Sequence, residues 1–148
     1  MCELRMVPFA REHLDAVEQL ERECFSEPWS RSLLEEALAS ENTELFVALC
    51  GGAVAGYAGM SFVLDEGAVT DVAVFSQFRG QGIGRALVRM LKNRCRERSL
   101  SFLTLEVRAS NQAAIALYQS EDFVPVGNRR DFYRKPTEDA VLMTWTNG

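Results

Sequence analysis

Residues 69–107 constrain the fold more than any other part of the chain. An apolar run ends at Val72-Ala73-Val74, and the glycine-rich segment Arg79-Gly80-Gln81-Gly82-Ile83-Gly84-Arg85 follows it. A strongly periodic helix is expected over residues 82–97, and a second apolar run covers residues 102–107. A strand, a helix and a strand in this order predict parallel pairing of the two strands through a right-handed crossover.

The glycine-rich segment predicts an anion site. Glycines that alternate beside a helix N-terminus leave backbone N–H groups uncovered, with the positive end of the helix dipole behind them. A dinucleotide fingerprint would need a glycine where Arg85 stands, although Glu106 falls about twenty residues on, where a ribose-binding acid would sit. A nucleotide-binding P-loop fails because no Gly-Lys-Ser/Thr follows. Taken alone, the loop also allows a glycine turn that binds nothing.

The remaining hydrophobic pattern predicts further strands and helices around this unit. Strands are expected at residues 4–8, 45–49, 54–63, 69–74, 102–107, 123–126 and 140–145, and helices at residues 12–24, 31–39, 82–97 and 111–119. The order β-α-α-β-β-β-α-β-α-β-β predicts an α/β fold, a mixed sheet with helices on both faces. At 148 residues, the chain is expected to form one domain over residues 1–148.

Composition narrows the classes of partner. The net charge of −5, from 16 basic and 21 acidic residues, argues against broad nucleic-acid binding. The basic face of the helix at residues 82–97 is therefore interpreted as a solvated face. No apolar stretch approaches the roughly 18 residues of a membrane span, and the N-terminus lacks a signal-peptide pattern. A cytoplasmic protein is expected, with neither a membrane nor nucleic acid as a direct partner.

The cysteines do not form a recognisable metal or disulfide pattern. Cys2, Cys24, Cys50 and Cys95 are widely scattered without a C-x-x-C pair, and His13 is the only histidine. No metal site is expected, and a disulfide framework is not expected in a reducing compartment. Each cysteine is predicted to pack as a small hydrophobe.

Several motifs together resemble a known family. Arg79-Gly80-Gln81-Gly82-Ile83-Gly84 resembles the Q/R-x-x-G-x-G/A signature of GCN5-related N-acetyltransferases. Within that family, four further segments resemble the RimI type, the bacterial ribosomal-protein N-alpha-acetyltransferases: residues 24–30, 105–111, 114–118 and 129–133, with the acidic residues 138–139 after them. The likeness spans nearly the whole chain, with the motifs in the same order.

The resemblance implies a fold and a cosubstrate. In this family the fourth and fifth strands splay apart, and the loop amides hold the pyrophosphate of acetyl-coenzyme A. The residues implied in cofactor binding are Val72, Ala73, Val74, Arg79, Gly80, Gln81, Gly82, Ile83, Gly84, Arg85 and Asn111. The backbone of the strand residues Val72-Ala73-Val74 is implied to run along the pantetheine arm and to direct an amide at the thioester oxygen. Such a donor would stabilise the charge that develops in the transition state.

Glu106 and Tyr118 are the candidate catalytic residues. Alternation along the strand places Glu106 on the face opposite Leu105 and Val107. From the residues alone, Glu106 is also compatible with a solvated surface charge and Tyr118 with core packing. The resemblance implies that Glu106 is the general base, directly or through a water, and that Tyr118 is the general acid. A glutamate suits an α-amine with a pKa of about 7.8 better than a lysine near 10.4.

The acceptor is less constrained than the cosubstrate. The resemblance implies the N-terminal alanine of small-subunit ribosomal protein number eighteen, acetylated directly in a ternary complex. Another peptide, a lysine or a small amine stays open as acceptor. A non-catalytic coenzyme A-binding module and nucleotide-dependent redox chemistry stay open as well. The chain departs from the family pattern at Asp71, where Asn is usual, at Ala68, where an acidic residue is often found, and at Asp122, where glycine ends the helix.

Overall fold

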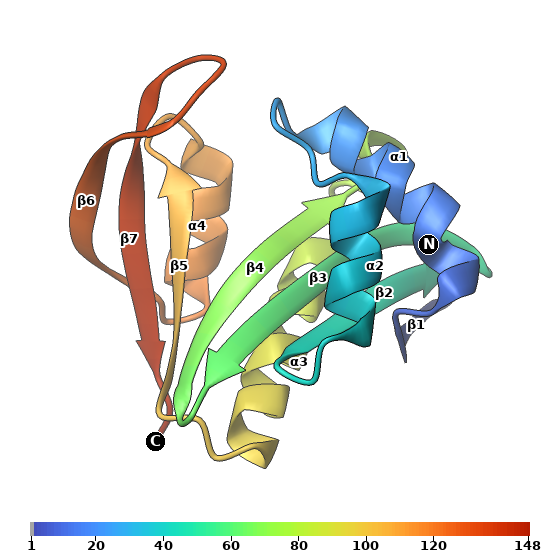
Figure 1. Ribbon diagram of the computed structural model, residues 1–148, viewed down its shortest axis with the longest axis horizontal. Helices are drawn as coiled ribbons and strands as arrows, with labels where there is room; N and C mark the ends of the chain where they lie inside the picture. Colours follow the sequence, from blue (N-terminus) through green and yellow to red (C-terminus); the bar gives the residue numbers. More distant parts are fainter. Residues whose placement is uncertain (1) are drawn as a thin grey trace.

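A seven-stranded sheet forms the centre of the computed structural model, which describes residues 2–148 (Figure 1). Its strands are β1 (Leu4–Pro8), β2 (Thr43–Cys50), β3 (Ala53–Val63), β4 (Glu66–Val74), β5 (Phe102–Arg108), β6 (Val124–Tyr133) and β7 (Glu138–Thr146). The helices are α1 (Leu14–Cys24), α2 (Arg31–Ala39), α3 (Ile83–Glu97) and α4 (Gln112–Ser120), with short 3-10 turns η1 (Arg11–His13) and η2 (Ser76–Phe78). This order confirms the predicted α/β arrangement.

The sheet has the strand order β1-β2-β3-β4-β5-β7-β6. Strands β4 and β5 pair in parallel, with α3 as their crossover, as the sequence predicts. The other neighbouring strands pair antiparallel. The sheet is therefore mixed, and its one parallel junction among the described residues lies at its middle.

That junction opens into a split. The β4–β5 ladder covers only Glu66–Ala68 opposite Phe102–Thr104, and beyond it the two strands diverge (Figure 1). The β3–β4 register shifts between Gly59 and Met60, which leaves Thr70 as an extra residue on β4. Such a bulge bends its strand and increases the local twist, which turns β4 away from β5. The splayed strands expected from the family resemblance are thus present, and the bulge is their local cause.

Gly59 makes room for this bulge. A Cβ atom at Gly59 would lie 2.6 Å from Thr70 Oγ1 and would also meet the side chain of Leu45. Only glycine allows so close an approach of the two strands. The geometry of the split is therefore encoded on β3 as well as on β4.

The helices cover the two faces of the sheet, and each face has its own hydrophobic core. Helices α1 and α2 pack on one face over β2, β3 and β4, with Leu20, Leu34 and Val47 fully buried. Helices α3 and α4 cover the other face, where Leu87 and Leu103 are fully buried. Strand β4, next to the split, therefore contacts α1 on one face of the sheet and α3 on the other.

The ends of two helices are fixed by residues that the sequence marks for this purpose. Ser30 Oγ accepts from the Leu33 N–H at 3.2 Å and caps α2, and Asn111 Oδ1 accepts from the Ala114 N–H at 3.2 Å and caps α4. Asp122 takes the left-handed conformation after α4, with φ of 70°. Aspartate can enter this region, which glycine most often occupies after a helix.

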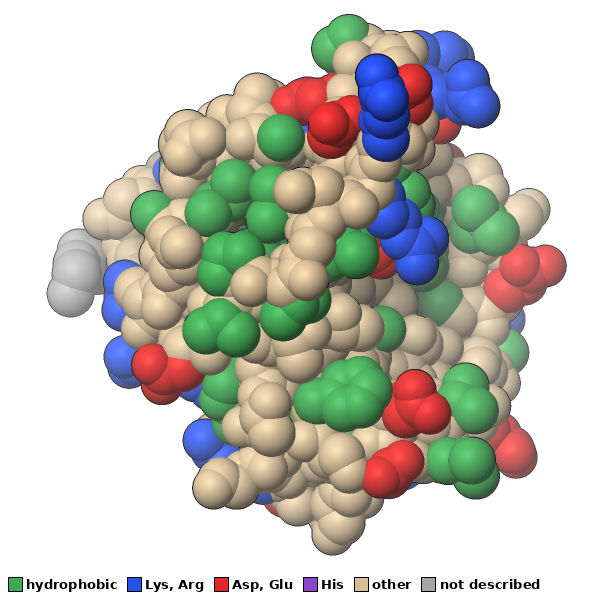
Figure 2. All heavy atoms as spheres, turned by 90° about the vertical axis from the view of Figure 1, so that its left-hand side faces the viewer, with side chains coloured by type: hydrophobic (Ala, Val, Ile, Leu, Met, Phe, Trp, Pro, Cys, Tyr) green, Lys and Arg blue, Asp and Glu red, His purple; other side chains and the backbone are tan. Residues whose placement is uncertain are grey.

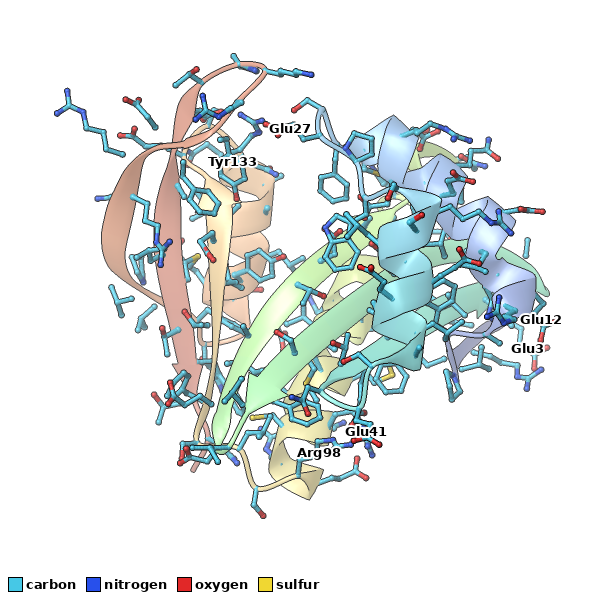
Figure 3. The ribbon with its side chains drawn as sticks, viewed as in Figure 1. Glu3, Glu12, Glu27, Glu41, Arg98 and Tyr133 are labelled. Atoms are coloured by element: carbon cyan, nitrogen blue, oxygen red, sulfur yellow. A yellow bond between two sulfur atoms is a disulfide. The ribbon has the colours of Figure 1, made fainter. Side chains whose placement is uncertain are left out.

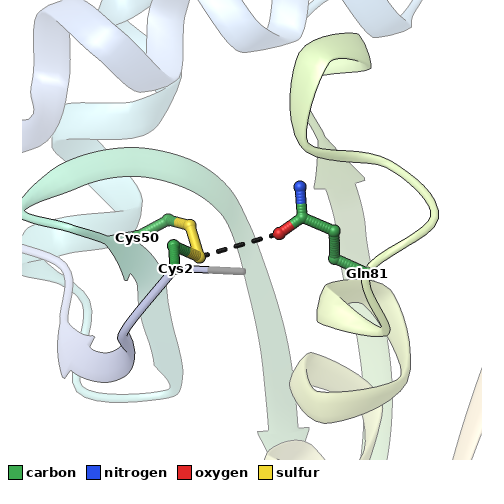
Figure 4. The surroundings of a disulfide bond; sticks show 3 residues. All are labelled: Cys2, Cys50 and Gln81. Atoms are coloured by element: carbon green, nitrogen blue, oxygen red, sulfur yellow. Dashed lines mark hydrogen bonds between the residues drawn. A yellow bond between two sulfur atoms is a disulfide. The ribbon is translucent and has the colours of Figure 1, made fainter.

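One cysteine prediction is wrong. Cys2 and Cys50 form a disulfide, whereas the sequence predicts that both pack as separate thiols (Figure 4). Antiparallel pairing of β1 with β2 places Leu4 opposite Cys50, so the register brings the start of the chain beside the end of β2. Sequence spacing alone carries no information about this register. Cys95 is fully buried, as predicted, and Cys24 is half-buried.

The outer strand β6 carries an exposed apolar surface. Figure 2 looks onto this side of the molecule and shows hydrophobic side chains spread over it. Val124, Val126 and Phe132 contribute to this surface. Two register shifts interrupt the pairing of β6 with β7, and such irregularity protects an edge strand from further pairing. In residues 2–148, none of the helices has both the length and the apolar character needed to cross a membrane.

Candidate functional site

A cavity of about 510 Å³ lies where β4 and β5 separate. Its walls come from the end of α1 and the segment before α2, from β4, β5, α4 and the end of β6. The lining residues are Glu21, Cys24, Phe25, Ser26, Glu27, Trp29, Val69, Thr70, Asp71, Val72, Leu105, Glu106, Val107, Arg108, Asn111, Ala114, Tyr118, Phe132 and Tyr133. Segments far apart in the sequence thus converge on one hollow.

The strand residues Val72-Ala73-Val74 lie at the β4 side of the split. On one edge they pair with β3, opposite residues 56–58. On the other edge the β5 ladder has already ended at Ala68, so no strand covers them. Val72 lines the cavity, while Ala73 is buried against α1. The backbone polar groups on this edge of β4 are therefore available to a ligand, apart from the Val74 carbonyl described below.

The glycine loop presents main-chain donors next to this strand. Gly80 and Gly82 have φ of 80° and 78°, a region that glycine enters without strain. Gly82 is the N-cap of α3, no side chain caps this helix, and its first turn carries no acidic residue. The amides of the first turn have no acceptor within the helix, and the helix dipole adds positive potential there. Uncapped amides of this kind are suited to an anion, as the sequence predicts.

The side chains of the loop point to other protein groups. Arg79 Nε donates to the Val74 carbonyl at 3.1 Å, and Arg85 Nη1 pairs with Glu121 at 3.3 Å. Ile83 is buried in the core, and the amide of Gln81 lies 3.8 Å from Cys2 Sγ (Figure 4). The loop therefore offers a ligand its backbone more than its side chains.

Gly84 lies in the first turn of α3, where it faces α4 and the end of β4. A Cβ atom at this position would make only ordinary van der Waals contacts, with Leu117 Cδ2 at 3.4 Å and Val74 Cγ2 at 3.9 Å. The packing of α3 therefore does not itself require glycine at this third position.

Glu106 and Tyr118 line the same cavity from two different elements. On β5, Leu103, Leu105 and Val107 are buried and Glu106 is exposed, which confirms the predicted alternation. Tyr118 reaches the cavity from the last turns of α4 and is 8% exposed. The structure thus brings together the two residues that the sequence singles out for proton transfer.

The environment of Tyr118 keeps its phenol protonated. Burial raises the pKa of Tyr118 above its usual value, with smaller contributions from Asp71 and Tyr133. The ring packs against Phe123 with centroids 5.6 Å apart, so the residue is also part of the core. Both interpretations left open by the sequence, core packing and a place in the site, hold for this residue.

Asn111 has a structural role that limits what it can offer. Its Oδ1 is occupied by the Ala114 N–H at the start of α4, and the residue also lines the cavity. The amide Nδ2 is the group that can donate to a ligand. The observed cap and the predicted place beside the cosubstrate are therefore compatible.

Arg108 and Tyr133 also belong to the site, although the sequence alone suggests no role for them. The Arg108 guanidinium lies 4.5 Å from the centre of the Tyr133 ring. Burial and then Glu106 raise the pKa of Tyr133 to about 12, and both residues line the cavity. Figure 3 shows Tyr133 and Glu27 at the open end of the split, on opposite sides of the gap. Arg108 and Tyr133 belong to motifs that carry the family resemblance, and this is the signal that could have identified them.

A buried acidic cluster is the second feature missed from the sequence. Tyr57 Oη lies within hydrogen-bond distance of carboxyl oxygens of both Glu21 and Asp71, and Glu21 is 1% exposed. Glu21 falls on the apolar stripe of α1, four residues after Val17 and three before Cys24. A charged residue on a buried stripe is a signal for a specific buried partner.

Cys24 is the one free thiol at the cavity among the described residues. Burial raises the pKa of this thiol, and the lowering effect of Arg79 does not offset it. A thiol with a raised pKa is a poor nucleophile at neutral pH. Within residues 2–148, no group of His, Cys, Asp and Glu side chains is arranged to hold a metal ion.

The chain is similar to known acetyltransferases over most of its length. The model of the acetyltransferase (GNAT) family matches residues 14–123. The ribosomal protein bS18-alanine N-acetyltransferase of Escherichia coli K12 is 38% identical over 137 residues, which cover 88% of each chain. The N-alpha-acetyltransferase RimI of Mycobacterium tuberculosis is 37% identical over 136 residues, covering 88% of this chain and 84% of that protein.

Comparison with solved structures agrees. The crystal structure of the ribosomal-protein-S18-alanine N-acetyltransferase from Escherichia coli superposes with a TM-score of 0.90 at 33% identity. The match covers 97% of this chain and 94% of that one. The fold and the sequence motifs therefore point to the same group of proteins.

Proposed function

Because the chain belongs to the acetyltransferase (GNAT) family, we propose that it transfers the acetyl group of acetyl-CoA to the N-terminal α-amine of a protein. The favoured acceptor is the N-terminal alanine of ribosomal protein bS18, on which the named Escherichia coli relative acts. One observation carries the proposal: Glu106 and Tyr118 line a single cavity at the split between β4 and β5. We propose the cytoplasm as the location of this activity, because the proposed acceptor is a ribosomal protein.

The residues present fit the cosubstrate. Acetyl-CoA supplies the acetyl group as a reactive thioester at one end and a pyrophosphate at the other. The open amides of residues 80–85 at the N-terminus of α3 match a pyrophosphate, with Arg79 and Arg85 adding positive charge nearby. The uncovered edge of β4 at residues 72–74 leads from this loop into the cavity, and Asn111 stands on the opposite wall. A backbone amide on that edge can donate to the thioester oxygen.

Glu106 is proposed as the general base. An α-amine has a pKa of about 7.8, so about a tenth of it is already neutral at pH 7. A carboxylate in the cavity can accept the remaining proton, directly or through a water molecule. A lysine side chain, near 10.4, would demand a stronger base. The residue type at position 106 thus favours an N-terminus as acceptor.

Tyr118 is proposed as the general acid. Its raised pKa keeps the phenol protonated throughout the neutral range, which an acid requires. The same apolar surroundings would raise the pKa of a thiol placed beside it, so acid and leaving group shift in the same direction. Direct transfer between the two substrates is favoured, because the cavity thiol of Cys24 is held protonated.

The proposal is tested with purified protein, acetyl-CoA and peptides, followed by mass spectrometry. A peptide with the free N-terminal alanine of ribosomal protein bS18 should gain one acetyl group at that amine. The matched control is the same peptide with a blocked N-terminus and an internal lysine. Acetylation of the lysine alone, or of neither peptide, would contradict the proposed acceptor.

A further inference from the structure

Three side chains beneath the cavity take no part in the proposed proton transfers. Glu21 on α1, Tyr57 on β3 and Asp71 on β4 are joined in a chain of hydrogen bonds, and both acids line the cavity. Tyr57 is fully buried and Glu21 is 1% exposed. Within residues 2–148, no lysine or arginine forms an ion pair with either carboxyl group.

The number of protons shared by these three side chains follows from the geometry of their hydrogen bonds. The phenol of Tyr57 carries one proton but contacts two carboxyl oxygens, that of Glu21 and that of Asp71, the latter at 2.9 Å. Two hydrogen bonds between three oxygens require two protons. One of the two acids must therefore be protonated, since two bare carboxylates cannot both be satisfied by one phenol.

Asp71 is the acid that holds this proton. Glu21 Oε1 also accepts the Trp29 N–H at 2.8 Å, so this carboxyl group already has a donor besides the phenol. Burial, together with Glu21, raises the pKa of Asp71 well above its usual value. Other titratable groups around Asp71 are the phenols of Tyr118 on α4 and Tyr133 on β6, and the side chains of Cys24, Glu27, Glu106 and Arg108 line the same cavity. The Arg108 guanidinium forms its ion pair with Glu138 and not with Asp71.

The hydrogen-bonded series Asp71–Tyr57–Glu21 ends at a wall of the cavity. The Trp29 N–H that Glu21 accepts belongs to the segment between α1 and α2, and Phe25, Ser26 and Trp29 of that segment line the cavity. If Glu21 moved, this part-buried backbone donor would lose its partner, which is unfavourable. The position of the wall therefore depends on the hydrogen bonds that hold Glu21.

We propose that Asp71 is a positioning residue: as a protonated acid it donates to Tyr57, which donates to Glu21, and this chain fixes the α1–α2 wall against which the acceptor binds. The inference rests on the proposed function, because it assigns that wall to the acceptor peptide. It also gives a physical reason why Asp71 can stand where the family usually has Asn. Both a carboxylic acid and a carboxamide can donate to a phenol oxygen.

The first test follows the Michaelis constant for the acceptor peptide against pH. In the native protein, loss of the Asp71 proton at alkaline pH should raise this KM, while Asp71→Asn keeps its donor at every pH. The ratio of the native KM to the Asp71→Asn KM should therefore rise about fivefold or more from neutral to alkaline pH. Titration of the peptide amine cancels in this ratio. A ratio that stays constant would overturn the proposal.

Asp71→Leu and Tyr57→Phe serve as disruptive variants. Each removes a link of the chain, so the peptide KM should rise about tenfold at neutral pH while the KM for acetyl-CoA stays within about twofold. Rescue by Asn but not by Leu separates hydrogen bonding from simple packing. An Asp71→Asn protein as impaired as Asp71→Leu would contradict the assignment.

A substrate-free measurement keeps this inference separate from the proposed function. Difference infrared spectroscopy of native protein against Asp71→Asn at neutral pH should show the C=O stretch of a protonated carboxylic acid, present in the native protein and lost in the variant. Absence of that band overturns the inference even if the peptide is acetylated. Presence of the band supports it even if the bS18 peptide proves to be the wrong acceptor.

Discussion

Arg108 Nη2 donates to Ser26 Oγ at 3.0 Å, joining two residues that lie 82 positions apart in the sequence. The same guanidinium donates to the carbonyls of Arg134 and Pro136, at 2.8 and 3.0 Å, and to Glu138 at 3.2 Å. One side chain of β5 thus ties the α1–α2 segment to the β6–β7 turn. These two segments meet at the open end of the split.

Replacing Arg108 by Ala should loosen the acceptor side of the cavity and leave the glycine loop unchanged. We expect the KM for the acceptor peptide to rise about tenfold, which corresponds to about 1.4 kcal/mol. Arg108→Lys should have nearly the same raised KM for the acceptor peptide, because an ammonium group lacks the planar fork that reaches several acceptors at once. Steady-state kinetics with each substrate varied in turn measures both effects.

Arg5→Ala, an exposed arginine on β1, is the control for the change in net charge. An equal rise in the KM for acetyl-CoA in Arg108→Ala would show that the arginine supports the whole site rather than its acceptor side.

Gly82→Ala tests whether the loop backbone holds the cosubstrate. A Cβ atom at this position would meet no neighbouring atom within 4 Å, so the effect comes from the left-handed backbone, φ of 78°. Alanine in this conformation costs about 1–2 kcal/mol, and the loop can relieve that strain by changing shape. Coenzyme A affinity, measured by calorimetry, should then fall at least tenfold.

Gly51→Ala is a matched control. Gly51 also has a left-handed backbone, with φ of 59°, and open space around its Cβ position, but it lies in the β2–β3 turn. The Gly51→Ala protein should lose a similar amount of stability and keep its affinity for coenzyme A. If both variants bind coenzyme A normally, the loop amides are not the anion site.

The sequence predicts those features that depend on local pattern. Alternation on β5 places Glu106, glycine spacing marks the start of α3, and the strand–helix–strand order requires the parallel β4–β5 pair. Each of these follows from backbone geometry over a few residues. The caps at Ser30 and Asn111 are local features of the same kind, because each cap bonds to an amide only three residues away.

Features that depend on register between distant strands are not accessible in this way. The Cys2–Cys50 disulfide follows from the pairing of β1 with β2, and the split follows from the bulge at Thr70 opposite Gly59. The hydrogen bonds of Asp71 require α1 to pack over β3 and β4. The sequence marks Asp71 as a departure from the family pattern, but its partner Tyr57 appears only once the sheet is folded.

Glu106→Gln should lower kcat by about a hundredfold, at the lower end of the range for loss of a general base. The isosteric amide keeps size and polarity but accepts no proton. The deficit should shrink as pH rises toward the pKa of the α-amine, about 7.8, because more of the acceptor is already neutral. The measurement is the pH–rate profile of native and variant protein with the bS18 peptide.

Glu66→Gln, at the exposed start of β4 and outside the cavity, controls for the loss of one negative charge. Parallel profiles of native protein and Glu106→Gln at all pH values would remove Glu106 from the role of base.

Tyr118→Phe separates the chemistry of this residue from its packing. The phenylalanine ring retains the contact with Phe123, so coenzyme A binding should be unchanged while kcat falls about a hundredfold. Equal loss of binding and turnover would instead indicate a purely structural residue. Calorimetry with coenzyme A and steady-state kinetics supply the two readouts.

The same variant makes a prediction for stability against pH. Burial raises the pKa of Tyr118 in the folded protein, whereas in the unfolded chain the phenol ionises near its ordinary value of about 10. The unfolded state therefore releases a proton that the folded state keeps, and the stability of the native protein falls as pH rises above that value. The Tyr118→Phe protein has no phenol at this position, so it does not lose stability in this way. Its free energy of unfolding relative to the native protein, measured with denaturant, should increase between about pH 8 and about pH 11. A difference that is independent of pH would show that the phenol is solvated in the folded protein and not held in the cavity wall.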